Sequence, residues 1–189
     1  MTLPPVIRVF FAIDLPLSIK ESLSEYIILL KKKSRTHGIR WTKPVNLHIT
    51  LQFLAEAHSE RLNTLIHHVR SRIEGVKQSD FRFGTPHLFP NPYRPRVIVL
   101  EIMPQDELAA LSERIGMGMQ DSQYDIEKRS FRAHLTLGRI KQPKEVNLSF
   151  LSGVSAPDIE KITVQEVVLF RSEPKPEGSE YTVIERLPL

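Results

Sequence analysis

Apolar residues in the first part of the chain follow two different spacings. Residues 8–16, RVFFAIDLP, form a β-rich run that a proline closes. The apolar residues after it recur at helical spacing and form one stripe: Ile19, Leu23, Ile27 and Leu30. Ser18 precedes this stripe and Glu21 follows three residues later, which is the spacing of a capping box. We therefore expect a helix that Ser18 caps.

The same order of elements recurs 88 residues later. The run RVIVLEIMP begins at Arg96 and again ends in a proline, and Asp106 follows as a second candidate helix cap. A new helical stripe then consists of Leu108, Leu111 and Ile115. In both halves a polar stretch and another strand-like run come next. The chain thus contains a strand–helix–strand unit twice, at about residues 6–76 and 94–142.

Three further segments complete the predicted order. The first unit has a second helix, which Ser59 can cap and Gly75 can end; its stripe is Leu62, Leu65, Ile66, Val69 and Ile73. Residues 81–96 hold four prolines, which favour a surface connection over the interior of an element. Residues 160–187 predict a hairpin, with strands at Ile162–Phe170 and Tyr181–Arg186 around the turn-rich SEPKPEGS.

This doubled order predicts an α+β protein, a single bilobal domain over residues 1–189 whose lobes are related by a pseudo-twofold axis. Each lobe would have a mainly antiparallel sheet with helices on its outer face. The other faces of the two sheets would meet across a central cleft.

One polar motif repeats at corresponding places in the two units. NLHITLQF contains His48 and Thr50, and RAHLTLGR contains His134 and Thr136, 86 positions further on. Side chains in a strand alternate between its faces, so each His and its Thr share a face while the leucines enter the core. If the sheets face each other, two His and two Thr converge on one polar spot.

Two imidazoles across a small gap suit acid–base chemistry, because the pKa of histidine lies near neutral pH and one ring can hold a proton that the other lacks. Threonine hydroxyls add donors for oxygens that gain charge in a transition state. A lone histidine on a strand is usually structural, and duplication alone could also explain both copies. Two copies at matching positions of a repeat favour a catalytic function.

Composition narrows the cellular setting and the partners. The net charge is +4, a small excess that favours an anionic partner, and there are no cysteines, which excludes disulfides and thiolate metal sites. Charged residues interrupt the apolar run at the N-terminus, which argues against a signal peptide. The adjacent His67 and His68 diverge around a helix and make a poor metal site. We expect a cytoplasmic monomer without metal, cofactor or membrane segment.

The paired motifs and their setting resemble the 2H phosphoesterase superfamily, and within it the RNA 2′,3′-cyclic phosphodiesterases, also named 2′-5′ RNA ligases. The likeness covers nearly the whole chain and includes RVFFAIDLP, RWTKPVNLHITLQFLAE, HLFPNPYRPRVIVLEI, FRAHLTLGRI and VVLFRSEPKPEGSEYTVIERLPL. That family has a bilobal α+β fold whose two motifs face each other across a central cleft.

The resemblance implies hydrolysis of a 2′,3′-cyclic phosphate at an RNA end, which leaves a 2′-phosphate, without metal or nucleotide cofactor. His48 would protonate the leaving 3′ oxygen and His134 would activate water, although the pseudo-twofold makes the two histidines nearly equivalent. Thr50 and Thr136 would hold phosphate oxygens. Reversed, the same site would join a 5′-OH to the cyclic phosphate in a 2′-5′ bond.

Further residues are candidates for substrate binding. Arg139, five positions after the second motif histidine, is an arginine position of the family; simple alternation puts it on the wrong face, and Gly138 would permit a bulge that turns it back. Trp41 and Phe11 could stack on a base, with core packing as the alternative. Arg40, Lys43 and Arg132 precede the motif strands and could line the mouth of the cleft.

Phe53 falls on the core face by alternation from His48, so we interpret it as packing.

Two other functions stay open. One is a phosphodiesterase for 2′-5′ oligonucleotides or small cyclic nucleotides, because fold and motif do not determine the substrate. The other is a non-catalytic RNA-binding module that uses the cleft alone.

Overall fold

The computed structural model of the 189-residue chain describes residues 3–126, 130–141 and 146–189. Residue 142, the last of the second predicted repeat unit, lies outside these ranges. The elements in chain order are β1 (Val6–Asp14), α1 (Leu17–Ser34), β2 (Ile39–Trp41), η1 (Pro44–Asn46), β3 (His48–His58), η2 (Ser59–Arg61), α2 (Leu62–Ile73), β4 (Ser79–Phe89), β5 (Val97–Met103), α3 (Asp106–Asp121), β6 (His134–Ile140), η3 (Ser149–Leu151), β7 (Ile162–Val164), β8 (Glu166–Glu173) and β9 (Glu180–Pro188).

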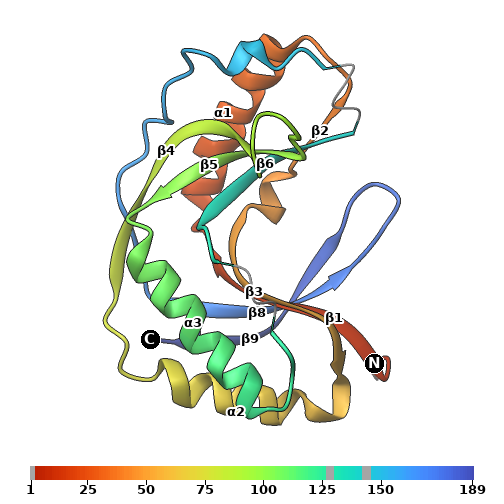
Figure 1. The fold of residues 1–189 in the computed structure, drawn as a ribbon, viewed down its shortest axis with the longest axis vertical. Coiled ribbons are helices and arrows are strands. Elements are labelled where there is room, and N and C mark those ends of the chain that lie inside the picture. Colours follow the sequence, from red (N-terminus) through yellow and green to blue (C-terminus); the bar gives the residue numbers. More distant parts are fainter. Residues whose placement is uncertain (1–2, 127–129, 142–145) are drawn as a thin grey trace.

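Within the described residues the strands form two antiparallel sheets, so the α+β bilobal prediction is confirmed. The first sheet has the order β3-β1-β8-β9, and the second sheet has the order β2-β6-β5-β4-β7. In Figure 1 the first sheet lies in the lower half of the molecule and the second in the upper half. The two motif strands, β3 and β6, belong to different sheets, which puts the repeated motif once in each lobe.

The helices do not stay with the strands that precede them in the chain. Figure 1 shows α1 beside the second sheet, although it follows β1 of the first sheet. Conversely, α3 follows β5 of the second sheet but packs against α2 and β3 in the lower lobe. Strand β2 likewise leaves the first repeat and pairs with β6. Because of this exchange, each lobe is built from both halves of the chain.

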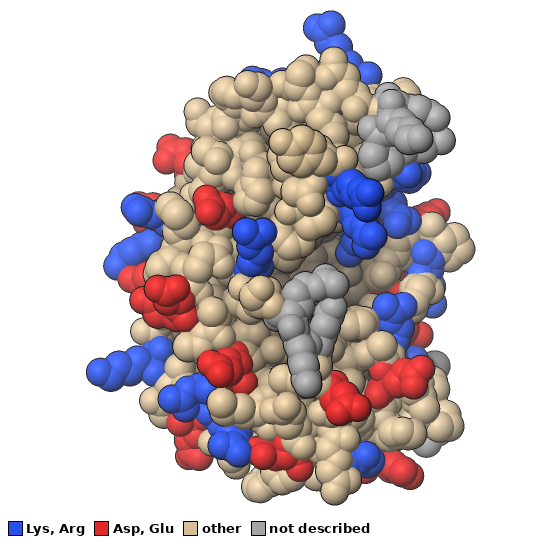
Figure 2. Space-filling view, viewed as in Figure 1, with Lys and Arg blue, Asp and Glu red and all other residues tan. Residues whose placement is uncertain are grey.

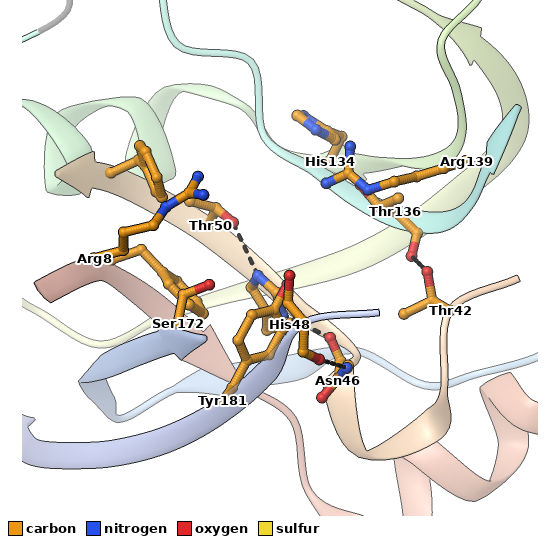
Figure 3. A pocket seen from close by; sticks show the side chains of 13 residues that line it. Arg8, Thr42, Asn46, His48, Thr50, His134, Thr136, Arg139, Ser172 and Tyr181 are labelled. Atoms are coloured by element: carbon orange, nitrogen blue, oxygen red, sulfur yellow. Dashed lines mark hydrogen bonds between the residues drawn. The ribbon is translucent and has the colours of Figure 1, made fainter. Parts of the chain in front are cut away.

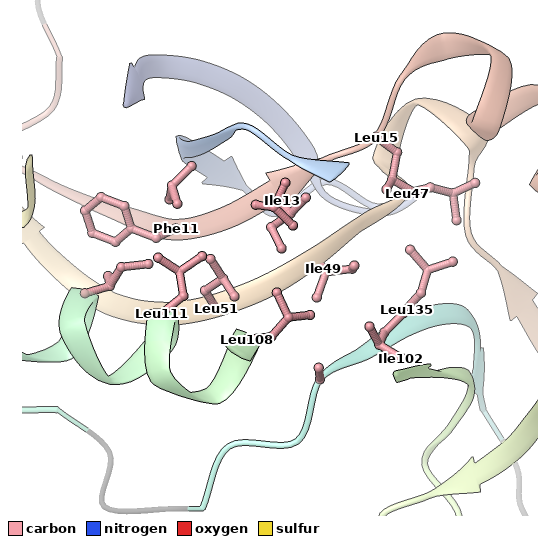
Figure 4. Packing of buried hydrophobic residues seen from close by; sticks show 14 of the residues in the cluster. Phe11, Ile13, Leu15, Leu47, Ile49, Leu51, Ile102, Leu108, Leu111 and Leu135 are labelled. Atoms are coloured by element: carbon pink, nitrogen blue, oxygen red, sulfur yellow. The ribbon is translucent and has the colours of Figure 1, made fainter. Parts of the chain in front are cut away.

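One large apolar core joins the lobes. It includes residues of β1, β3 and α3 together with residues of β5 and β6 in the second sheet. Figure 4 shows Ile49 and Leu108 next to Leu135 and Ile102, which come from opposite lobes. All four side chains are at most 1 % exposed. Burying them favours one fixed lobe arrangement, because their apolar area stays away from water only when the lobes stay together.

The predicted helix caps are wrong. Ser18 lies in the first turn of α1, Asp106 is the first residue of α3, and Ser59 lies in the short η2 turn before α2. The N-cap positions belong instead to Pro16, Gln105 and Arg61, none of which makes a side-chain capping bond. Tertiary contacts override the local signal, since the Ser59 hydroxyl bonds the carbonyl of Pro4 instead.

Two loop and strand predictions also need correction. The proline-rich stretch after residue 80 is not only a connection, because β4 continues to Phe89. Pro86 is tolerated inside β4 because a register shift separates its pairing with β5 from that of Phe83. The predicted strand Ile162–Phe170 is two strands: β7 pairs with β4 in the second sheet, whereas β8 pairs with β1 and β9 in the first. Gly75, with φ +75°, follows α2 as predicted.

Helix α3 meets α2 at Gly118. A Cβ at this position would lie 2.6 Å from the Cα of Val69, a backbone atom that no rotamer change can move. Gly118→Ala should therefore lower the free energy of unfolding by about 1–3 kcal/mol, the usual cost of overpacking, as measured by urea unfolding. Gly116→Ala is the matched control, because its Cβ would meet only flexible side-chain ends of Gln52 and Ile126. An equal loss in both variants would contradict the packing argument.

Candidate active site

His48, the first residue of β3, is held by both of its ring nitrogens. Its Nδ1 lies 2.7 Å from the carbonyl oxygen of Asn46, and its Nε2 lies 3.0 Å from Oγ1 of Thr50. A carbonyl oxygen can only accept, so Nδ1 carries the proton of the neutral ring. Nε2 then accepts from the Thr50 hydroxyl, and this nitrogen is the one available for proton transfer.

Aromatic rings surround the His48 imidazole. The ring centroids of Phe10, Tyr181 and Phe170 lie 4.8, 5.2 and 6.3 Å from it. They belong to β1, β9 and β8, the other strands of the first sheet. Burial among these rings disfavours the charged imidazolium and lowers the pKa of His48 from 6.5 to about 4. His48 is therefore neutral at neutral pH in the free protein.

His134, the first residue of β6, repeats this anchoring in a more open setting. Its Nδ1 lies 2.7 Å from the carbonyl oxygen of Arg132, the same relation that His48 has to Asn46. Phe89 stacks on the ring at 4.6 Å with an interplanar angle of 21°. Burial lowers the pKa of His134 below its ordinary value. The two histidines thus share a tautomer but differ in their surroundings.

A side chain that the sequence did not point to fixes the main chain before His134. The Gln105 carboxamide accepts a hydrogen bond from the N–H of Ala133 (2.8 Å) and donates to its carbonyl oxygen (3.0 Å). It also donates to the carbonyl oxygen of Ile102 at 2.7 Å. Gln105 therefore pairs with this segment as a neighbouring strand would, and it steadies the Arg132 carbonyl that orients His134.

Both motifs line one cavity between the sheets. This central cavity, of about 190 Å³, has His48, Thr50, His134, Thr136 and Arg139 among its lining residues. Figure 3 shows His48 and Thr50 on β3, and His134 and Thr136 on β6 at the opposite wall of the cavity. The leucines and isoleucine between these polar residues are buried, as alternation predicted: Leu47, Ile49, Leu51, Leu135 and Leu137.

A β-bulge follows the threonine of each motif. In β3 the pairing with β1 passes from Thr50 to Gln52, and in β6 the pairing with β5 passes from Thr136 to Gly138. The skipped residue in each case is the motif leucine, which reverses the alternation beyond it. The bulge expected near Gly138 is thereby confirmed, and Arg139 lines the central cavity.

The matching bulge in β3 corrects the interpretation of Phe53. This ring is 45 % exposed and lines the central cavity, where Arg8 lies over it at 5.3 Å. Unbroken alternation from His48 predicted the core face, and the bulge turns it to the other. No residue in β3 signals this bulge as Gly138 does in β6.

The prediction that Phe11 contacts substrate is wrong, because Phe11 is 1 % exposed and lies in the main core (Figure 4). Its neighbour Phe10 lines the central cavity instead. Strand β1 is apolar on both faces, so alternation could not tell the two phenylalanines apart.

Trp41 lies at the edge of a second cavity rather than in the central one. This basic cavity, of about 110 Å³, is lined by Arg40, Trp41, Lys43 and Arg139 among others. The indole packs close to Gly138, where a Cβ would come within 3.2 Å of it. The Nε1 of Trp41 is buried and has no hydrogen-bond partner among the described residues.

The hairpin of β8 and β9 closes one side of the central cavity. The Asn46 side chain donates to the carbonyl oxygen of Ser179 at 2.8 Å, and Lys43 lies 3.9 Å from Glu177 in an exposed ion pair. These contacts hold Ser179 and Tyr181 beside His48, in the lining of the cavity. The segment is far from both motifs in sequence, so only the fold reveals its place at the site.

Two further features concern metal ions and membranes. Across residues 3–126, 130–141 and 146–189, no group of three or more His, Cys, Asp or Glu side chains is placed to hold a metal ion. None of the helices in the described part of the chain has the length and apolar character needed to cross a bilayer.

The sequence of the chain matches a known protein family. One family description, LigT like Phosphoesterase, matches the chain twice, at residues 13–99 and 100–181, so each half of the chain carries its own copy. The chain belongs to the LigT-like phosphoesterase family. This twofold match agrees with the internal repeat and with one His-x-Thr motif in each half.

Relatives of this phosphoesterase are similar over nearly their whole length. A protein of Archaeoglobus fulgidus named RNA 2′,3′-cyclic phosphodiesterase is 30% identical over 176 residues, which are 92% of this chain and 96% of the relative. One of Thermus thermophilus with the same name is 31% identical over 193 residues, covering 96% and 90%.

Solved structures share the fold. The protein TT0787 of Thermus thermophilus has a TM-score of 0.78 and 27% identity, and the match covers 97% of this chain and 98% of that one. Escherichia coli LigT in complex with 3′-AMP also has a TM-score of 0.78 and the same coverage. At 24% identity, the second structure supports the fold alone.

Burial among the rings of Phe10, Phe170 and Tyr181 should control the pKa of His48. In an NMR titration of the ring protons, His48 should titrate near pH 4, and Phe10→Ala should raise its pKa toward 6.5 because water then reaches the ring. His134 is the internal control, since the ring stacked on it is Phe89. An unchanged His48 pKa, or an equal rise at His134, would show that burial by Phe10 is not the cause.

Proposed function

We propose that this phosphoesterase hydrolyses the 2′,3′-cyclic phosphate at RNA ends to a 2′-phosphate by two-histidine acid–base catalysis that needs no metal ion. The observation that carries this proposal is the pair of His-x-Thr motifs on opposite walls of one small cavity. The names of the relatives from Archaeoglobus fulgidus and Thermus thermophilus support the same substrate.

The chemistry requires two proton transfers on opposite sides of one phosphorus atom, because the attacking and leaving oxygens lie roughly in line. His134 takes a proton from water, and the new P–O bond forms as the P–O3′ bond breaks. His48 gives its proton to the departing O3′. Thr50, Thr136 and Arg139 hold the non-bridging oxygens, where charge accumulates in the transition state.

The surroundings of the two histidines support this division of roles. His48 lies within 4.8–6.3 Å of three aromatic centroids, which exclude water from its side of the cavity. His134 also borders another cavity of about 540 Å³, through which water can reach the phosphorus. A bound phosphate anion favours the imidazolium form and so raises the pKa of both rings, which lets His48 carry the proton that it lacks in the free protein.

The RNA strand whose end carries the cyclic phosphate extends from the central cavity into the basic cavity. Arg40, Lys43 and Arg139 line it and supply the positive charge that a phosphodiester backbone attracts. Lysine and arginine side chains also gather right of centre in the upper half of Figure 2. Trp41 forms one edge of this cavity, where an aromatic face can stack on a base.

Loss of either imidazole should abolish most turnover. His48→Ala and His134→Ala should each lower kcat on an oligonucleotide with a 2′,3′-cyclic phosphate end by about 10² or more, because each removes one proton transfer. RNA binding should persist in both variants. The exposed His37 provides the control His37→Ala, which should keep full activity.

The same assay identifies the product and tests the metal-free mechanism. Only a 2′-phosphate product and persistent activity in EDTA fit the proposal. Full activity in either His variant would instead exclude two-histidine catalysis, and RNA binding without any turnover of the parent protein would favour a non-catalytic module.

The pH profile should differ between the free and the bound protein. In the free protein His134 must be neutral and His48 protonated, and both pKa values lie below 6.5, with that of His48 at about 4. Activity rises with pH as the base deprotonates and falls as the acid does, so kcat/KM should peak on the acidic side of 6.5. The kcat profile should peak at higher pH, because bound phosphate raises both pKa values. Coincident profiles with an alkaline optimum would contradict this account.

A further inference from the structure

The bulge after Thr136 interrupts the regular pairing of β6 and brings Arg139 into the central cavity. The pairing of β6 with β5 passes from Thr136 to Gly138 and skips Leu137. A bulge disrupts the ladder locally, so the main-chain groups around it need other hydrogen-bond partners. The direction of Arg139 therefore depends on what holds the main chain at Thr136 and Leu137.

One residue of the neighbouring segment bonds both of these positions. The main-chain N–H of Thr42 donates to the carbonyl oxygen of Leu137, and the Thr42 hydroxyl donates to the carbonyl oxygen of Thr136, each at 2.9 Å. Figure 3 shows the hydroxyl bond as a dashed line. Thr42 directly follows β2, which pairs with β6, so its N–H continues this pairing by one residue. Its side chain then adds a bond that the main-chain ladder does not provide.

The segment that carries Thr42 is packed tightly against β6. Strand β2 pairs with β6 from Ile39 to Trp41, directly before Thr42. It lies so close to Gly138 that a Cβ there would come within 2.9 Å of the Ile39 side chain and 3.2 Å of the Trp41 ring. Close packing leaves such a segment little room to shift. The Thr42 hydroxyl therefore reaches the main chain of β6 from a fixed position.

The bulge in β3, on the opposite wall, is held in the same manner. The pairing of β3 with β1 skips Leu51, and the hydroxyl of Ser112 in α3 donates to the carbonyl oxygen of Leu51 at 2.7 Å. Ser112 is buried, and the Gln52 side chain donates to its hydroxyl at 3.1 Å. Thr42 belongs to the first half of the chain and bonds the bulge of the second, whereas Ser112 does the reverse. A hydroxyl from the other half thus bonds a bulge carbonyl on both walls.

The Thr42 hydroxyl is poorly suited to contact the phosphate, although Thr42 lines the central and the basic cavity. Phosphate oxygens accept hydrogen bonds, and a threonine hydroxyl has a single proton to donate. In Thr42 this proton goes to the Thr136 carbonyl. Thr42 can therefore act on the substrate only through the main chain of β6.

We propose that Thr42 is a positioning residue that holds the β6 bulge and so keeps the Arg139 guanidinium directed at the phosphate. This inference rests on the proposed function and adds a residue that acts through Arg139. Without the hydroxyl, the Thr136 carbonyl loses a donor and the bulge loses a bond that fixes it. Arg139 then takes other directions as well, and turnover slows because small misplacements of groups at a reacting centre cost large factors in rate.

The kinetic test measures hydrolysis of an oligonucleotide with a 2′,3′-cyclic phosphate end. Thr42→Val keeps the shape of the side chain, removes its hydroxyl and should lower kcat/KM about tenfold. Thr42→Ser should restore most of this loss. In an Arg139→Gln background, Thr42→Val should cost less than about twofold, because the residue through which Thr42 acts is already gone. Equal losses in both backgrounds, or a fully active Thr42→Val, would overturn the proposal.

Thr163→Val is the matched control for a lost threonine hydroxyl. Thr163 lies in β7, at the opposite edge of the same sheet from β2, and its hydroxyl donates to Asp80 at 2.6 Å on the exposed surface. This substitution should leave kcat/KM unchanged. An equal loss in Thr163→Val and Thr42→Val would show that any weakening of the sheet reduces activity, and it would remove the specific role of Thr42.

A titration of the free protein separates a failure of this inference from a failure of the proposed function. Burial lowers the pKa of His48 and of His134, and the positive charge of Arg139 lowers both further. If Thr42→Val lets Arg139 turn away, both pKa values should rise in an NMR titration, as they should in Arg139→Gln. Neither substitution removes the other charged groups that act on these rings: Asp14, Lys20 and His87.

This titration needs no turnover, so it tests the position of Arg139 even if cyclic phosphates are not hydrolysed. Thr163→Val should leave both histidine pKa values unchanged. A rise in Arg139→Gln without any rise in Thr42→Val would show that the bulge keeps its place without the hydroxyl, and it would overturn the proposal.

Discussion

The hydrogen bond from each motif histidine to the main-chain carbonyl two residues before it is the interaction on which the site depends. These bonds, 2.7 Å long at both His48 and His134, place the proton of each neutral ring on Nδ1. Nε2 is then the nitrogen that can exchange a proton with a ligand. The acceptors are the carbonyl oxygens of Asn46 and Arg132, which lie just before β3 and β6. A distortion of the chain at these residues would therefore change the tautomer as well as the position of the ring.

Further hydrogen bonds fix the main chain just before each motif histidine. The Asn46 side chain bonds the β8–β9 hairpin, and Gln105, at the start of α3, bonds both main-chain groups of Ala133. The exchanged helices and the shared core then fix the lobes relative to each other. A site divided between two lobes needs this rigidity, because a shift of about 1 Å between catalytic groups costs orders of magnitude in rate.

Each half of the chain supplies one wall of the central cavity with its own His-x-Thr motif, and the surroundings of the two histidines differ. His48 is enclosed by three rings of the first sheet, whereas His134 has one stacked ring and an open cavity beside it. Arg40, Lys43 and Arg139 line the basic cavity, whereas Glu101 and Arg132 both line the cavity beside His134. Two duplicated histidines can therefore perform different tasks, since surroundings rather than identity determine their proton affinities.

The sequence by itself determined the repeat, the α+β class and the polar face of each motif, because strand alternation and helical spacing are local properties of the chain. The resemblance to the family pointed to Arg139, and Gly138 before it permitted the bulge that turns Arg139 toward the cavity. Only the tertiary structure decided that Phe10 rather than Phe11 reaches the central cavity, and that a bulge turns Phe53 into its lining. It also decided that Tyr181 and Gln105 join the site. Strand β1 is apolar on both of its faces, and the hairpin and α3 meet the motifs only through long-range packing, so no pattern within a short stretch of sequence could reveal these contacts.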